Sequence, residues 1–527
     1  MAYCEQCGAR LAMDVRFCEE CGTPVADENV ETLAVGQDET PKSDAGLCFL
    51  GRGWKNEWFS FSQGHTGGEL GLILTRESAL LDDVSSNAVQ LHSLVADYIR
   101  SAARRNVRYA YLDLDNICSA ADSMGDVAST IAVLSRVAEI ACPKYLFILG
   151  SERVIDFVRW ENQSKDGDAD VDSDLCYATL SDDSPWDEQT CAFRNMICVG
   201  RLPTYPDESY ESFASYFKNV AASETGVPDV VPYGLSALVW ESESNHVFKE
   251  VSAVPVDTSP TVTVRSVEGQ MESRCNLLYF NLHGSNMTEF WYGQSGGEYP
   301  EAFQPSALLG LSGPYVLGVE ACYGARWAEG LTPSDSILLT ALENHCLAML
   351  ASSRIAYGTS MPEGSCADIM IGQFVLHVAK GRSAGEAHLE GIRKLCANPE
   401  QMDDSDVKTL AEFALYGDPS VRLVMPQTKS IIPDAFRPVQ IPDVRAAVSM
   451  ELARIDSRIE GLIDDLVRDQ LFPGFGEIIA QARVQKVFKM ASGMNQKIYH
   501  AEHSGWRMVA RVYFDDRGCV HKAVMSK

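Results

Sequence analysis

The chain has 527 residues with 44 basic and 73 acidic side chains, a formal net charge of −29, and this length allows two or three structural units around a large apolar core. The acidic balance argues against nucleic acid as the main ligand, because phosphate binding requires clustered Lys and Arg. No run approaches the ~18 apolar residues of a membrane span, and we see no secretory signal at the chain start. The sixteen cysteines are too dilute for a disulfide scaffold. We therefore expect a cytoplasmic protein without membrane contact.

Two CxxC pairs stand near the start of the chain. Cys4 and Cys7 form the first pair, Cys18 and Cys21 form the second, and a glycine follows each pair. Two such knuckles can supply four thiolates to a tetrahedral Zn²⁺, and the glycines allow the tight turns below the metal. Because the protein fills all four positions and leaves none for water, the zinc would be structural. The segment is similar to the short zinc ribbons of many bacterial proteins.

Shifts in composition divide the chain into four predicted segments. After the cysteine-rich start, an acidic and polar stretch with little periodicity is typical of a linker. The body that follows alternates apolar and amphipathic stretches, and the chain changes character again past Pro426. The predicted segments are a zinc ribbon at 1–25, an acidic linker at 26–45, an α/β body at 46–428 and a small C-terminal α+β domain at 436–527. The family resemblance described below implies that the body consists of an N-terminal α/β subdomain at 46–225 and a subdomain with His283 and Cys322 at 226–428.

The first subdomain shows the alternation of a parallel sheet. Residues 107–112 and 144–149 have the branched and aromatic content of strands, whereas 87–103 and 127–140 have helical spacing of apolar residues. Strands separated by helices predict a mostly parallel sheet covered on both faces. The acidic stretch 166–174 that follows lacks the central Gly and terminal Glu of an EF-hand loop, so we interpret it as a solvated acidic loop.

His283 and Cys322 each follow a short apolar run, at 276–282 and 315–319. Runs of this length and composition are typical of buried parallel strands. Catalytic groups gather at the carboxyl ends of such strands, so we expect both residues at one edge of the sheet. An imidazole beside a thiol stabilises the reactive thiolate, which favours a cysteine hydrolase. The alternative is a buried thiol and an unrelated loop histidine.

The end of the chain predicts a helix followed by strands. Apolar residues repeat at four-three spacing from Val448 to Leu466, which predicts an amphipathic helix that ends near Pro473. The runs 507–514 and 519–524 flank an Asp-Asp-Arg-Gly turn, which predicts a hairpin. These elements form the expected C-terminal α+β domain, whose role the sequence leaves open.

Several motifs resemble gingipain-type cysteine peptidases over about residues 105–425. The segments 199–203 (VGRLP) and 416–420 (YGDPS) are the most distinctive, and 282–285 (LHGS) and 320–324 (EACYG) also match. The order of His before Cys and their separation are also near those of caspases. The resemblance implies a caspase-like α/β/α sandwich and hydrolysis of peptide bonds by a Cys-His dyad.

The resemblance also implies roles for individual residues. Cys322 would be the nucleophile, His283 would protonate the leaving amine, and the N–H groups of Gly284 and Cys322 would form the oxyanion hole. Glu320 matches an acidic position that binds a basic side chain in legumain-like and metacaspase-like relatives, and Asp174 matches a gingipain acid of the same purpose. The alternatives are a strand-end carboxylate in water for Glu320 and simple membership of the acidic loop for Asp174.

The sequence therefore predicts an intracellular caspase-like cysteine endopeptidase that cleaves protein or peptide substrates after Arg or Lys. Glu152 and Asp156 are candidates for the residue that orients His283, and neither is assigned. The alternative function is a non-catalytic caspase-fold adaptor that binds protein partners through its zinc ribbon and C-terminal domain.

Overall fold

The structure is a computed structural model in which the chain forms two compact units, Met1–Ala45 and Gly46–Lys527. In the first unit the described residues form two short antiparallel strands, β1 (Ala2–Tyr3) and β2 (Arg10–Leu11). The four predicted zinc ligands and the predicted linker lie outside the described residues. The residues described are 2–3, 10–11, 47–64, 67–117, 126–162, 164–180, 196–328, 330–359, 364–398, 402–425, 450–472, 474–482, 484–503 and 506–527.

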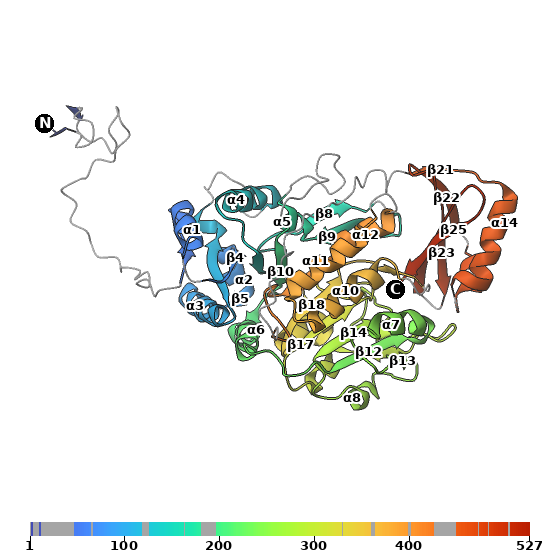
Figure 1. Cartoon of the computed structure of the whole chain (residues 1–527), viewed down its shortest axis with the longest axis horizontal. Helices are drawn as coiled ribbons and strands as arrows, with labels where there is room; N and C mark the ends of the chain where they lie inside the picture. Colours follow the sequence, from blue (N-terminus) through green and yellow to red (C-terminus); the bar gives the residue numbers. More distant parts are fainter. Residues whose placement is uncertain are drawn as a thin grey trace. The chain divides into compact units, whose positions relative to one another are not determined.

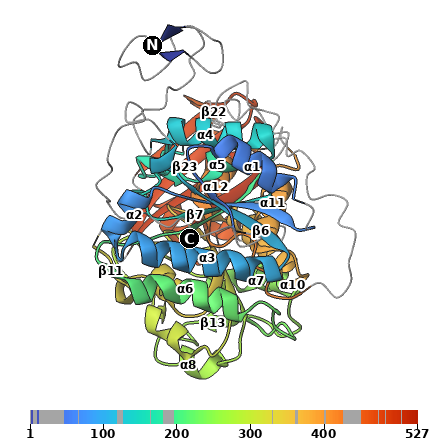
Figure 2. The same ribbon diagram turned by 90° about the vertical axis from the view of Figure 1, so that its left-hand side faces the viewer.

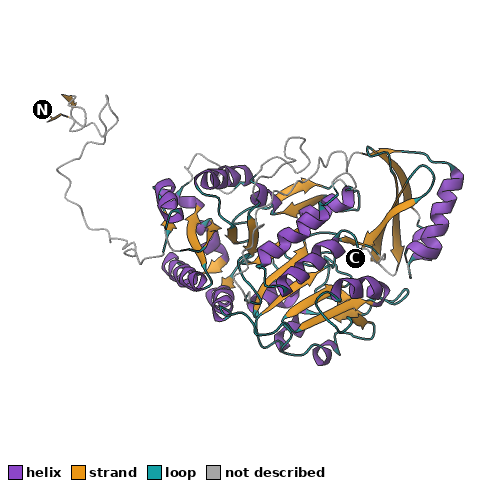
Figure 3. Cartoon of the chain, in the orientation of Figure 1, coloured by secondary structure: helices purple, strands orange, loops and turns teal. Residues whose placement is uncertain are grey.

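An 11-stranded sheet runs through the second unit in the order β13-β12-β14-β17-β18-β20-β10-β7-β4-β6-β3 (Figure 1, Figure 3). Every neighbouring pair is parallel except β18 and β20, which are antiparallel. Two parallel half-sheets therefore meet at that pair. The strands are β3 (Phe49–Leu50), β4 (Glu69–Thr75), β6 (Val107–Asp113), β7 (Tyr145–Leu149), β10 (Cys198–Leu202), β12 (Pro232–Ala237), β13 (Asp257–Ser259), β14 (Leu277–Asn281), β17 (Tyr315–Val319), β18 (Cys346–Ser352) and β20 (Phe413–Gly417).

Helices cover both faces of this sheet, so the predicted α/β/α sandwich with a mostly parallel sheet is confirmed (Figure 2). Burial on both faces explains why the strands are continuous apolar runs. One face carries α3 (Ala88–Arg104), α6 (Tyr210–Ala222) and α9 (Ile337–Glu343), and the other carries α1 (Trp54–Ser62), α4 (Val127–Ile140), α7 (Glu241–Phe248), α10 (Ala367–Ala379) and α11 (Ala384–Leu395).

Three two-stranded sheets and several short helices surround the large sheet. Within the described part of the chain, no helix combines the length and the apolar content needed to cross a bilayer. The short sheets pair β5 (Val84–Ser85) with β11 (Glu208–Ser209), β8 (Val158–Glu161) with β9 (Asp170–Ser173), and β15 (Trp291–Tyr292) with β16 (Glu301–Phe303); the short helices are α2 (Glu77–Asp83), α5 (Leu175–Thr179), α8 (Val267–Gln270) and α12 (Asp404–Glu412).

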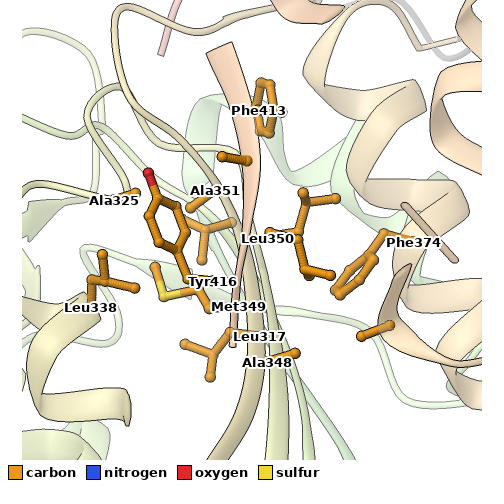
Figure 4. Close-up of a cluster of buried hydrophobic side chains, with 14 of the residues drawn as sticks. Leu317, Ala325, Leu338, Ala348, Met349, Leu350, Ala351, Phe374, Phe413 and Tyr416 are labelled. Carbon is orange, nitrogen blue, oxygen red and sulfur yellow. The ribbon is translucent and has the colours of Figure 1, made fainter. Parts of the chain in front are cut away.

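The apolar core is continuous where the two half-sheets meet (Figure 4). Met349 and Leu350 of β18 alternate between the faces, so that Met349 lies toward Leu338 of α9 and Leu350 toward Phe374 of α10. All four side chains are buried, and burial of each contributes roughly 1.5–3 kcal/mol. This packing fixes β18, and with it the neighbouring strand β17 that leads to Cys322.

A second, antiparallel sheet has the order β19-β25-β24-β23-β22-β21. Its first strand, β19 (Tyr357–Gly358), comes from the predicted catalytic subdomain, so the last strand of the chain pairs with a segment of that subdomain. The predicted hairpin is confirmed, since β24 and β25 pair across a turn in which Gly518 N donates to Asp515 O at 2.9 Å. The other elements are β21 (Met450–Leu452), β22 (Val484–Met490), β23 (Asn495–His503), β24 (Trp506–Phe514), β25 (Val520–Ser526), α14 (Ser457–Leu466), a π-helical turn (Val467–Leu471) and α15 (Gly476–Ala480).

The predicted start of the amphipathic helix at Val448 is wrong. Met450–Leu452 form β21, which pairs with β22, and the helix begins at Ser457. Asp456 caps it by accepting a hydrogen bond from the N–H of Arg458 at 2.8 Å. Pairing with β22 therefore overrides the helical spacing of the preceding residues. The domain boundaries predicted within Gly46–Lys527 stay predictions.

Candidate active site

His283 and Cys322 follow the carboxyl ends of neighbouring parallel strands. Phe280 of β14 is opposite Val319 of β17, and the N–H of Glu320 donates to the carbonyl of Phe280 at 2.9 Å. His283 follows the end of β14 at Asn281 by two residues, and Cys322 follows the end of β17 at Val319 by three residues. The sheet therefore brings the two segments to one edge, where catalytic groups of α/β proteins gather.

Gly284 allows the two segments to approach each other. A Cβ atom on residue 284 would overlap the carbonyl oxygen of Cys322 and would lie 3.1 Å from the Cβ of Ala321. Glycine is required here because backbone meets backbone. On its other side, His283 exchanges two backbone hydrogen bonds with Tyr292, at 2.9 and 2.8 Å. The His-Gly segment is thus held from both sides.

Gln294 orients the imidazole of His283. Nε2 of His283 lies 2.9 Å from Oε1 of Gln294, and the amide nitrogen of Gln294 donates to the carbonyl of Gly296 at 2.7 Å. The second bond sets the amide so that its oxygen faces the ring, which makes Nε2 of His283 the protonated nitrogen. Nδ1 then carries the lone pair that a base requires.

Of the two acids suggested as orienting residues, only Glu152 has a side-chain partner in the described part of the chain. Glu152 pairs with Arg159 at 3.3 Å, and the backbone carbonyl of Asp156 accepts from the hydroxyl of Tyr177 at 2.6 Å. Within the described part of the chain, neither acid forms a hydrogen bond or an ion pair with His283. Gln294 could not be predicted from the sequence, because an amide in a Gly-rich loop produces no pattern.

Aromatic rings enclose His283. The ring centroids of Trp240 and Tyr299 lie 4.4 and 5.2 Å from the imidazole, and those of Phe475 and Trp506 lie 6.2 and 6.0 Å away. The last two rings belong to the predicted C-terminal domain. His283 is 3% exposed, and this burial lowers its pKa to about 4, so the imidazole is neutral at pH 7.

The thiol of Cys322 is also enclosed. Its Sγ lies 3.5 Å from the carbonyl oxygen of Ala356, and burial raises the pKa of the thiol. Tyr323, the next residue, has a φ of 49°, a left-handed conformation that costs a non-glycine residue about 1–2 kcal/mol. The thiol and the imidazole are therefore both neutral at pH 7.

Glu320 is fully buried, so its interpretation as a strand-end carboxylate in water is wrong. Its Oε1 accepts from the hydroxyl of Tyr279 at 2.7 Å, and its Oε2 accepts from Nζ of Lys527 at 2.6 Å. Burial raises the pKa of Glu320 to about 8, against the opposing effect of the Lys527 ammonium. The sequence analysis assigned no role to Lys527, nor to Asp368, which shares that ammonium.

Asp174 lies in a different cluster from Glu320. Its two oxygens accept from Nε and an η nitrogen of Arg201 at 2.9 and 2.6 Å, and Arg201 is fully buried. Arg201 belongs to β10, the third strand along from β17 in the sheet. The structure therefore does not bring the two predicted substrate-binding acids together through any described contact.

The interpretation of residues 166–174 as a solvated loop is wrong. The stretch includes β9, and its acids pair with basic side chains from distant parts of the chain, because enclosed carboxylates require cations. No group of side chains in the described ranges fits a metal ion. The ion pairs are those of Asp166 and Asp168 with Lys408, both at 2.6 Å, and of Asp170 and Asp172 with Arg354, at 2.7 and 2.8 Å.

Comparisons with known proteins give one family match and several structural similarities. Residues 3–25 match the zinc-ribbon domain, which confirms the predicted ribbon. No curated protein matches the sequence. The chain is similar to the Arg-specific cysteine proteinase gingipain R (RGPB), with 10% identity and a TM-score of 0.48 over 88% of this chain and 98% of that one. It is also similar to RgpB in the complex of Porphyromonas gingivalis RgpB pro- and mature domains (10%, TM-score 0.47, 86% and 99%) and to a structure described as a protease (12%, TM-score 0.44, 87% and 91%).

Proposed function

We propose that this chain is a caspase-like cysteine endopeptidase in which Cys322 and His283 form the catalytic dyad. The observation that supports the proposal is the approach of the two segments after neighbouring parallel strands, where the backbone of Gly284, next to His283, lies against the Cys322 carbonyl. A thiol and an imidazole in this arrangement are the groups that acyl transfer through a thioester requires.

In the proposed reaction, Sγ of Cys322 attacks the peptide carbonyl while its proton passes to Nδ1 of His283. The oxygen of the tetrahedral intermediate accepts hydrogen bonds from the N–H groups of Gly284 and Cys322. His283 then protonates the leaving amine, and water hydrolyses the thioester. Gln294 keeps the imidazole in the tautomer whose Nδ1 can accept the thiol proton.

For specificity, we propose that Glu320 binds the basic side chain of the residue before the scissile bond. It lies two residues before Cys322 on the same strand end, and it already binds an ammonium group. The prediction that Asp174 does the same has less support, because Arg201 engages both of its oxygens. We propose a positioning role for Asp174 within the fold.

The four cysteines of the ribbon, Cys4, Cys7, Cys18 and Cys21, are proposed to hold one structural zinc ion, because four thiolates fill its tetrahedral shell. Elemental analysis of purified protein should give about one zinc per chain. The Cys4→Ser/Cys7→Ser variant should lose that zinc, whereas Cys519→Ser, at an exposed cysteine outside the ribbon, should retain it. Equal zinc in both variants would contradict the assignment.

The alternative, a non-catalytic adaptor, is favoured by one observation: the thiol and the imidazole are both buried and neutral. The deciding experiment compares the wild type, Cys322→Ala and Trp506→Ala on fluorogenic peptides with Arg, Lys, Asn or Asp before the leaving group. We expect cleavage after a basic residue that Cys322→Ala abolishes and Trp506→Ala accelerates, since Trp506 lies over His283. Absence of cleavage by the wild type, by Trp506→Ala and by Lys527→Ala, which frees Glu320, would favour the adaptor.

A further inference from the structure

The side chain of Lys527 enters a closed polar pocket beside the proposed dyad. Its Nζ lies 2.6 Å from Oε2 of Glu320, 2.6 Å from Oδ1 of Asp368 and 2.9 Å from Oδ1 of Asn281. All four side chains are at most 2% exposed. An ammonium has three N–H donors, so these acceptors use its full capacity.

The walls of the pocket follow the shape of a lysine stem. A Cβ atom on Gly358 would overlap Cε and Nζ of Lys527, so only glycine at this position leaves room for the stem. Asp368 is held by the N–H groups of Thr359 and Ser365, which donate to its Oδ2 at 2.9 and 3.1 Å and leave Oδ1 for the ammonium. The pocket is therefore built around a lysine side chain rather than closed by a chance ion pair.

The backbone of Lys527 pairs with the segment that contacts the thiol of Cys322. β25 pairs antiparallel with β19, and the N–H of Lys527 donates to the carbonyl oxygen of Ala356 at 3.0 Å. The same oxygen accepts from Sγ of Cys322 at 3.5 Å. The backbone N–H of Lys527 and the thiol of Cys322 thus share one acceptor, the carbonyl oxygen of Ala356. Pairing with the edge of a sheet is also the mode in which many proteins bind extended peptides.

We propose that Asn281, Glu320 and Asp368 form the specificity pocket for a lysine before the scissile bond, and that Lys527 occupies this pocket as an intramolecular substrate mimic. This inference rests on the proposed function and extends it. It identifies lysine rather than arginine as the preferred residue, because three acceptors around one point suit a compact ammonium and not a planar guanidinium with five donors.

Occupation by Lys527 has a consequence for activity. With β25 in place, a peptide can reach neither the pocket nor β19, and His283 stays beneath Phe475 and Trp506. A tethered occupant acts at an effective concentration on the order of millimolar, so peptides at lower concentration compete poorly. Substrate therefore binds only after β25 leaves β19.

The test uses the full chain with Lys527→Ala and two probes, Nα-acetyl-lysine methylamide and its arginine counterpart. Calorimetry should show that the variant binds the lysine amide and not the arginine amide, and that the wild type binds neither. With peptides below saturation, the variant should cleave after lysine at least about tenfold faster than the wild type. Adding Asp368→Asn to the variant should weaken lysine binding by about tenfold or more, because one charged acceptor is lost.

Control variants separate this effect from loosening of the domain. Lys497→Met removes another buried lysine of the C-terminal domain, which pairs with Asp464 at 2.7 Å and Glu460 at 3.2 Å, and it should leave the cleavage rate at the wild-type value. Lys527→Met keeps the stem and removes only the charge, so it replaces Lys527→Ala if that variant does not fold. Its cleavage after lysine should also rise.

The outcomes distinguish the two proposals. Failure of the folded Lys527 variant to bind the lysine amide, or equal cleavage by variant and wild type, would overturn the pocket assignment even if the protein is a peptidase. Binding of the lysine amide without cleavage would support the pocket and contradict the proposed peptidase function. An equal increase in cleavage by Lys497→Met would overturn the substrate-mimic role of Lys527.

Discussion

The backbone of Gly284 lies against the carbonyl oxygen of Cys322, so closely that residue 284 has no room for a Cβ atom. This contact joins the segment that carries the proposed base to the segment that carries the proposed nucleophile. The geometry of the site therefore depends on a glycine that itself has no functional group.

Replacing Gly284 with alanine should push the His-Gly segment away from Cys322. Because a displaced oxyanion donor typically costs about 100- to 1000-fold in rate, we expect kcat to fall by that order while the global fold persists. Peptide hydrolysis and circular dichroism measure the two effects. Gly313→Ala is the matched control, since a Cβ there meets no atom within 4 Å; equal activities of the two variants would contradict the proposed role of Gly284.

Gln294 is proposed to position His283 rather than to touch substrate. In Gln294→Glu, a carboxylate would face Nε2 and favour the imidazolium, which should raise the pKa of His283 from about 4. The rate of Cys322 alkylation, measured against pH, should show this as a shift of the His283 titration toward higher pH. Gln294→Leu should lower kcat by roughly tenfold or more without that shift. If Gln294→Glu and Gln294→Leu gave the same profile, Gln294 would have only a packing role.

Burial of His283 predicts loss of stability in acid. Its pKa is about 4 in the folded chain and 6.5 in its ordinary state, so between these values the unfolded chain binds a proton that the folded chain does not. The free energy of unfolding therefore has its full value above pH 6.5 and decreases as the pH falls toward 4, by about 1.4 kcal/mol per pH unit. Urea unfolding measures the free energy of unfolding at pH 7 and pH 5. The difference between the two values should be smaller for His283→Asn than for the surface variant His246→Asn. Equal differences would contradict the burial of a neutral imidazole.

Asp174 should matter for stability rather than for substrate binding. Removing it in Asp174→Ala leaves the guanidinium of Arg201 buried without its carboxylate, which typically costs about 3–5 kcal/mol. Asp97→Ala, at an exposed pair with Arg100, should cost less than about 1 kcal/mol. Urea unfolding measures both values. A stable Asp174→Ala variant with a raised KM for basic peptides would restore the substrate-binding prediction.

The sequence predicted strands correctly where the pattern of apolar residues directly reflects burial in the sheet. Parallel strands buried on both faces appear as continuous apolar runs, so the runs at 276–282 and 315–319 predicted β14 and β17 and the sheet edge where His283 and Cys322 lie. The pattern failed at Val448, where pairing of β21 with β22 overrides helical spacing.

Partners from distant segments could not be predicted. The acids of residues 166–174 appeared solvated because Lys408 and Arg354, which neutralise them, lie far along the chain. For the same reason no sequence pattern linked Glu320 to Asp368 or to Lys527, which follows the last strand of a separate sheet. Contacts of this kind depend on the folded arrangement and not on spacing.

The most direct test of the account is covalent labelling of the Lys527→Ala variant with a peptidyl-lysine chloromethyl ketone, followed by intact-mass and peptide mapping. The account predicts one adduct per chain, on Cys322, slower labelling of the wild type, and no adduct in Lys527→Ala/Cys322→Ala. Labelling at another cysteine, or labelling of the wild type and both variants at one rate, would contradict the assignment of Cys322 as the nucleophile beside a lysine pocket.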